Sequence, residues 1–159
     1  MKLSYLNNLN YFVENILSDA YTIELIKNLK LEINKSDEPF QGKAIDIKLV
    51  QHVLPKEIMS AWIFILKKNI PSMAHYHPNS IQHTVMIEGK GKVMIGNRVH
   101  DLKLFDSTAE NIWLIIDNNV PHEFFPEDED MIVISFHTCA PENLMEVKCA
   151  TGEMRIYKS

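Results

Sequence analysis

The sequence predicts an all-β domain, either a sandwich or a barrel, preceded by a helical extension. From residue 41 onward, short apolar and β-branched runs recur at regular intervals between turn-forming residues, a spacing typical of antiparallel sheets. Before Pro39 there is no glycine or proline, and apolar residues recur at helical spacing instead. We therefore expect a helical extension over residues 1–40 and a β-domain over residues 41–159.

The helical extension has apolar residues at every third or fourth position, as on one face of a helix. These residues are Leu6, Leu9, Val13, Ile16 and Leu17. Ser18-Asp19 interrupts the pattern, and the apolar residues from Tyr21 to Leu29 indicate either a second short helix or a helix-to-strand transition. We expect the extension to cover the open end or one face of the β-domain.

The β-domain contains a series of runs with strand character. They cover residues 44–49, 59–66, 84–87, 92–95, 99–105, 112–116, 123–125, 131–137, 144–149 and 154–157. The run 59–66 is almost continuously apolar, which is typical of a strand covered on both faces. Gly96-Asn97 follows the run 92–95, and this two-residue turn signal predicts a tight hairpin.

A pair of histidines, His75 and His77, lies on a short extended segment. Residues two apart in a strand point to the same face, so both imidazoles should enter one space. His122 can supply a third imidazole from a later strand. Three imidazoles are a sufficient protein ligand set for a catalytic metal site with open positions, so we expect a metal to bind His75, His77 and His122.

Composition excludes several classes of partner. The net charge is -5 and no stripe of Lys or Arg is present, which argues against nucleic acid. No run approaches the ~20 apolar residues that cross a bilayer, and the N-terminus lacks the apolar stretch of a signal peptide. Cys139 and Cys149 do not form a Cys-x-x-Cys motif, so we expect free thiols and a cytoplasmic protein.

The region from about residue 60 to residue 137 resembles the cupin superfamily. His75-Tyr76-His77, then Gln82, then Gly89 follow the spacing of the first cupin motif, and His122 follows Asn119 in the second. Gln82 stands where the family usually has a glutamate ligand, and Asn119 stands where it prefers glycine. The resemblance implies a double-stranded β-helix, also called a jelly-roll barrel. It also implies a divalent transition metal (Fe, Mn, Ni or Zn), with Gln82 as a weak fourth ligand beside the three histidines.

The residue that faces the metal from the strand after His77 is open to two interpretations. Motif spacing selects Gln82. Strand alternation favours His83, which shares its parity with the apolar residues Val85 and Ile87; a β-bulge could reconcile the two. Motif spacing is the more specific signal, so we expect Gln82 to face the site.

The remaining histidines, His52, His100 and His137, have no partner pattern. We expect each of them at the surface or at a strand end. The aromatic residues of the apolar runs, such as Trp62 and Phe136, are expected in the core.

The resemblance implies a metal-dependent enzyme, similar to cupin dioxygenases, that acts on a small molecule. One alternative is a small-ligand-binding or sensing cupin without catalysis. Another is a sugar isomerase or epimerase, but Arg98 and Arg155 are the only arginines available for diphosphate binding. Cupins often pair edge to edge, so we expect a homodimer, with the strand 59–66 and the N-terminal segment as candidate contacts.

Overall fold

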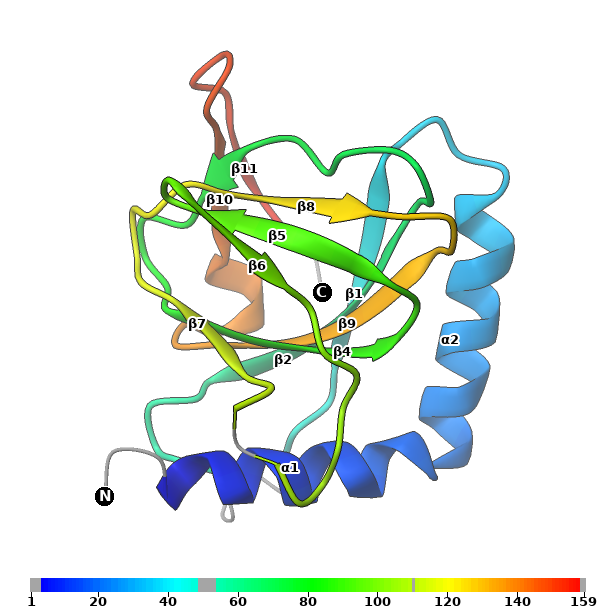
Figure 1. Cartoon of the computed structure of the whole chain (residues 1–159). Helices are drawn as coiled ribbons and strands as arrows, with labels where there is room; N and C mark the ends of the chain where they lie inside the picture. Colours follow the sequence, from blue (N-terminus) through cyan, green and yellow to red (C-terminus); the bar gives the residue numbers. More distant parts are fainter. Residues whose placement is uncertain (1–3, 49–53, 110, 158–159) are drawn as a thin grey trace.

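The computed structural model describes residues 4–48, 54–109 and 111–157. Two antiparallel sheets pack face to face as a barrel, and two helices lie outside it (Figure 1). The five-stranded sheet has the order β1 (Phe40–Ile45), β2 (Ser60–Leu66), β9 (Met131–His137), β4 (Gln82–Glu88) and β7 (Leu114–Ile116). The six-stranded sheet has the order β11 (Met154–Ile156), β10 (Met145–Lys148), β3 (His75–Tyr76), β8 (His122–Pro126), β5 (Gly91–Ile95) and β6 (Arg98–Asp101). The predicted all-β fold with an N-terminal helical extension is confirmed.

The N-terminal segment forms α1 (Ser4–Leu17) and α2 (Ala20–Ile33), so its second part is a helix and not a strand. Asp19 caps α2, because its carboxylate accepts a hydrogen bond from the Thr22 amide at 3.1 Å. The apolar stripe of α1 packs on the five-stranded sheet, where Leu9 and Phe12 join Phe136 in one buried cluster. The helices thus cover the outer face of this sheet (Figure 1).

Strand β2 is buried on both faces, as its apolar run predicts. Ala61, Ile63 and Ile65 pack in the cluster beneath the helices, whereas Trp62 and Phe64 belong to the cluster inside the barrel. Because β2 lies between β1 and β9, it offers neither a free edge nor a free face. The expectation that this strand forms a dimer contact is therefore wrong.

Several local predictions can be compared with the backbone. The strand expected over residues 44–49 begins earlier, at Phe40, because β1 pairs with β2 from Phe40 opposite Leu66 to Ile45 opposite Ala61. Gly96 adopts a φ of 61° in the two-residue turn between β5 and β6. Asn119 has a φ of 64°, the left-handed conformation that asparagine tolerates.

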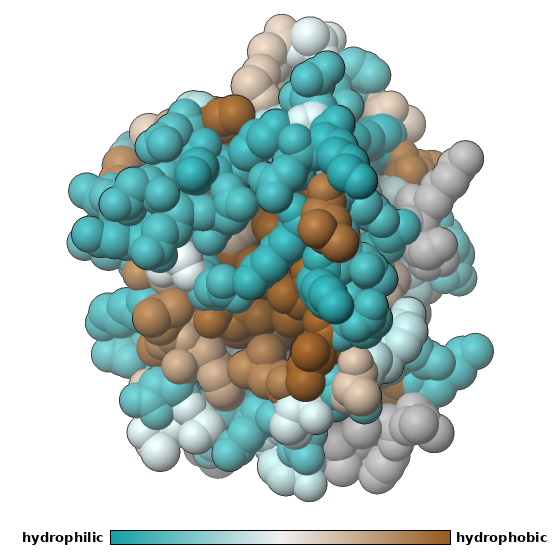
Figure 2. Space-filling view, turned by 90° about the vertical axis from the view of Figure 1, so that its right-hand side faces the viewer, coloured by the Kyte–Doolittle hydropathy of each residue, from teal (hydrophilic) through white to brown (hydrophobic). Residues whose placement is uncertain are grey.

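The outward surface of α2 exposes the apolar side chains of Tyr21, Ile23 and Leu31. Figure 2 faces the side of the molecule where α2 lies, and hydrophobic atoms gather there in a patch. A homodimer contact through the N-terminal segment stays a prediction, which sedimentation can test. Neither of the two helices within the described ranges is long and apolar enough to cross a bilayer.

Candidate metal centre

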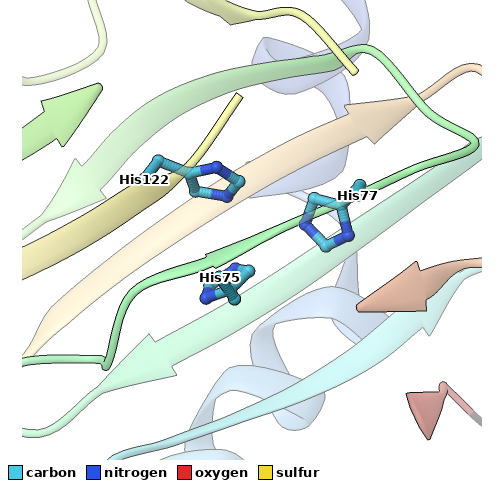
Figure 3. A group of neighbouring side chains, drawn as sticks. All are labelled: His75, His77 and His122. Atoms are coloured by element: carbon cyan, nitrogen blue, oxygen red, sulfur yellow. The ribbon is translucent and has the colours of Figure 1, made fainter. Parts of the chain in front are cut away.

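The three histidines expected to bind metal lie together inside the barrel. His75 starts β3 and His122 starts β8, and the two residues are opposite each other in the ladder between these strands. Their ring centroids are 4.4 Å apart, and the ring of His77 lies 5.2 Å from that of His75. One ligand nitrogen from each ring lies within 4.8 Å of the other two, and all three side chains are buried. Figure 3 shows the rings gathered around one space.

The Nδ1 atom of each of these histidines contacts a backbone carbonyl. The distances are 3.0 Å from His75 to Met73, 2.6 Å from His77 to Met145 and 3.1 Å from His122 to Val120. A carbonyl oxygen can only accept, so Nδ1 carries the proton and Nε2 keeps its lone pair. Such outer contacts fix the ring orientation of metal-binding histidines.

Burial keeps the three rings neutral. Burial, together with the neighbouring His77, lowers the pKa of His75 to about 3. Burial also lowers the pKa of His77, and it lowers the pKa of His122 well below the ordinary value, with His75 and His77 adding to the effect. At neutral pH no proton therefore competes with a cation for these nitrogens.

Gln82 points into the barrel beside the histidines. Its Nε2 donates to the Thr84 hydroxyl at 2.6 Å and to the Ser135 hydroxyl at 3.2 Å. Its Oε1 is buried and has no hydrogen-bond partner among the residues that the structure describes, and the same holds for Nε2 of His122. A cation bound between Oε1 of Gln82 and Nε2 of His122 would give both atoms a partner, so these donor atoms fit a divalent transition metal.

His83 points the other way, out of the barrel and under α1, where its Nε2 lies 3.1 Å from the Tyr5 hydroxyl. The alternation argument for His83 assumed that the apolar face of β4 lines the barrel. The helices reverse this, because Val85 packs in the cluster beneath them while Met86 belongs to the interior cluster. The bulge in β4 lies at Met86–Glu88, beyond Gln82, and does not change which of the two residues faces inward.

Comparison with solved structures identifies the architecture. The oxalate decarboxylase of Lactobacillus farciminis, in complex with formate, has a TM-score of 0.54 and 19% identity over 72% of this chain. The DMSP lyase of Ruegeria pomeroyi has a TM-score of 0.54 and 15% identity over 72% of this chain. A cupin-2 domain protein of Rhodospirillum rubrum has a TM-score of 0.50 and 12% identity, covering 77% of this chain and 68% of its own.

The chain has the cupin fold. At these identities the likeness concerns the fold alone. The match spans 32% of the oxalate decarboxylase chain and 54% of the lyase chain. No protein-family model matches the sequence, and no curated protein matches it.

Two features beside His75, His77 and His122, here called the histidine trio, were not predicted from the sequence. His137 was expected at the surface or at a strand end, and the strand end is confirmed, but its burial beside the metal site was not predicted. It ends β9, but it is 1% exposed, its ring centroid lies 5.0 Å from that of His77, and its Nδ1 lies 2.8 Å from the Ser80 hydroxyl. His100 is partly exposed in β6, and His52 lies outside the described residues.

The second feature is a buried carboxylate, Glu146, on β10. Its Oε1 lies 3.5 Å from Nε2 of His75. The signal that could have indicated it is weak: one acidic residue flanked by Met145 and Val147 in a short run near the C-terminus.

Space around the trio is small. Inside the barrel a cavity of about 30 Å³ is lined by His75, His77 and Gln82 together with apolar walls such as Phe64 and Phe124. A hollow of about 100 Å³ reaches the site from outside. It shares His75 and Phe40 with the inner cavity, so it marks the side from which a ligand can approach.

Proposed function

We propose that this cupin-fold chain is a metal-dependent enzyme that acts on a small molecule. His75, His77 and His122 would hold Fe, Mn, Ni or Zn, and Gln82 would be a weak fourth ligand. The observation that supports this best is the convergence of three neutral imidazoles whose Nδ1 atoms are all occupied by backbone carbonyls. Such an arrangement leaves three Nε2 lone pairs for one cation.

The protein's contribution is to prepare and enclose this site. Backbone carbonyls fix the orientation of the three imidazole rings, and burial keeps these rings neutral. The amide of Gln82 is oriented by Thr84 and Ser135, so its carbonyl oxygen is the free end. A bound divalent ion supplies Lewis acidity to polarise the substrate. The apolar walls limit water around the reacting atoms.

The reaction class we propose is oxygen insertion into a small chelating substrate, such as a thiol or a diketone. Three neutral histidines and a neutral amide leave the charge of the ion uncompensated by these ligands, which favours anionic substrate groups. The size of the cavity and hollow supports a small substrate. The oxalate decarboxylase neighbour binds formate, a small carboxylate, which supports a small anionic ligand and not a particular reaction.

Elemental analysis of protein purified without added metal tests the first part of the proposal. We expect about one transition-metal ion per chain, and a sharp loss in the double variant His75→Ala/His77→Ala. The matched control is His100→Ala, on the partly exposed strand β6, which should keep its metal. Equal metal content in the double variant and the wild type would refute the site.

Oxygen consumption tests the second part. Metal-loaded protein is mixed with a panel of thiols and diketones, and uptake is followed with an oxygen electrode. Uptake that depends on substrate and is lost in the double variant supports oxygen insertion. Metal binding without uptake across the panel contradicts that reaction class and favours the ligand-binding alternative.

A further inference from the structure

Glu146 is a buried acid that is not among the proposed metal ligands His75, His77, His122 and Gln82. It lies on β10 and is 2% exposed, and its Oε1 is 3.5 Å from Nε2 of His75. A buried carboxylate normally requires a charged partner or several hydrogen bonds.

The contact between His75 and Glu146 is a contact between two acceptors. Nδ1 of His75 donates to the Met73 carbonyl, so Nε2 presents a lone pair toward the carboxylate. Two facing lone pairs repel unless a proton or a cation lies between them. A metal ion removes the conflict, since two ligands that share one ion through bonds of about 2.1 Å lie about 3 to 3.5 Å apart.

The carboxylate is held in place by the C-terminal hairpin. Glu146 on β10 faces Arg155 on β11 in the strand register, and Nε of Arg155 lies 2.7 Å from Oε2. The Tyr157 hydroxyl donates to Oε1 at 2.5 Å. The Arg155 guanidinium itself lies over the rings of Phe40 and Tyr157, at 5.3 Å and 4.7 Å from their centroids.

The two oxygens of the Glu146 carboxylate make different contacts. Oε2 is paired with Arg155, whereas Oε1 has only the Tyr157 hydroxyl and can accept further. Burial raises the pKa of Tyr157 well above its ordinary value, and the neighbouring Glu146 raises it further. The phenol therefore stays a donor and holds Oε1 toward the trio.

We propose that Glu146 is the carboxylate ligand of the metal, supplied by the C-terminal hairpin because position 82 carries a neutral glutamine. The inference rests on the metal site proposed above. Glu146 lies at the border of the trio, next to His75, and is not among the groups within 4.8 Å of one another. Metal binding by Glu146 would require its carboxylate to shift from its contacts with Arg155 and Tyr157 toward an ion held by the three histidines. The ligand set then has three imidazoles and one charged oxygen, so a divalent ion still keeps positive charge for an anionic substrate group.

The test compares Glu146→Gln, which keeps the size and removes the charge, with Glu153→Gln. Glu153 is an exposed acid that follows the same β10 strand and pairs with Lys148 at 3.5 Å, so it is a matched control. Affinity for Zn(II) is measured by competition with a chelator. We expect Glu146→Gln to lose about a hundredfold in affinity, and Glu153→Gln to bind as the wild type does.

Moving the charge tests the role of position 82. In the double variant Glu146→Gln/Gln82→Glu, we expect most of the lost Zn(II) affinity to return, because a carboxylate again enters the site. Binding of Co(II) gives an independent reading, since its visible spectrum reports the ligand set. Weakened affinity with an unchanged Co(II) spectrum would overturn the ligand role of Glu146.

The crystal structure of the Zn-loaded wild type needs no variant and applies even if Glu146→Gln does not fold. An oxygen of Glu146 within about 2.2 Å of the zinc supports the inference, and a carboxylate that remains only on Arg155 and Tyr157 overturns it. Failure of the wild type to bind metal would refute the metal site itself. Metal binding that is equal in the wild type and Glu146→Gln would refute only the role of Glu146.

Discussion

His122 and His83 are both buried histidines, but they lie on opposite sides of the five-stranded sheet. His122 faces the barrel interior with two other rings, and its Nε2 has no hydrogen-bond partner among the described residues. His83 lies beneath α1 on the outer face, where its Nε2 contacts the Tyr5 hydroxyl. Burial lowers the pKa of both.

The difference shows that burial and a lowered pKa do not define a metal site. Both histidines have these properties, but only His122 shares its space with other unprotonated nitrogens. The outer face instead packs the sheet against the helices through a large apolar cluster. We infer that the outer face contributes stability and the inner face contributes chemistry, and the following predictions test this division.

The largest expected effect is on the outer face. Phe136 is fully buried there, in edge-to-face contact with Phe12 at a centroid distance of 5.4 Å. Phe136→Ala should lower the free energy of unfolding by about 3 to 5 kcal/mol, because it leaves a cavity in a packed cluster. Urea denaturation of the metal-free protein measures this. Zn(II) affinity of the folded variant should stay within about twofold of the wild type; a parallel loss of affinity would show that the two faces are coupled.

The next effect is on metal affinity and belongs to the inner face. His122→Ala removes one of three converging imidazoles and should weaken Zn(II) binding at least about a hundredfold, or about 2.7 kcal/mol. The matched variant His83→Ala removes a buried imidazole on the other face and should bind Zn(II) normally. Chelator competition compares the two variants, and similar losses in both would contradict the division between the faces.

The smallest expected effect is on the pH dependence of stability, and it should be similar for a histidine on either face of the sheet. In the unfolded chain these histidines take up a proton near pH 6.5, whereas the pKa of His75 in the folded protein is about 3 and that of His83 is also lowered. The unfolded state therefore binds more protons below pH 6.5, and stability falls as the pH falls toward 3. Each such histidine contributes up to about 1.4 kcal/mol per pH unit.

Urea denaturation of the metal-free protein between pH 7 and pH 5 measures this slope. We expect His75→Gln and His83→Gln each to make the slope shallower than in the wild type. A slope that responds only to His75→Gln would mean that His83 accepts its proton in the folded protein.

The sequence predicted the pair His75 and His77 because its signal is local, and it predicted His122 through the resemblance to the second cupin motif. His75 and His77 are two apart on an extended segment, and the ladder between β3 and β8 then places His122 opposite His75. The choice between Gln82 and His83 was harder, because β4 is buried on both faces and alternation alone does not say which face lines the barrel. That depends on where α1 and α2 pack, which is a tertiary property.

The neighbours of the trio could not be predicted from the sequence. His137 reaches His77 because β9 pairs with β4 and ends beside the site. Glu146 reaches His75 because Lys148 on β10 pairs with His75 on β3, about seventy residues away in the chain. Neither residue has a motif or a spacing, since long-range strand pairing alone determines its position.

The narrow interior of the barrel has a consequence for selectivity. A void of about 30 Å³ admits roughly one or two water molecules, so under the proposed function only a very small reactant would fit inside the barrel beside the histidines. The apolar walls exclude larger molecules from this void. Any bulkier compound must meet the ion from the outer hollow, where Phe40, Lys148 and Arg155 form the rim. Under the proposed function, discrimination among substrates would thus belong to this rim.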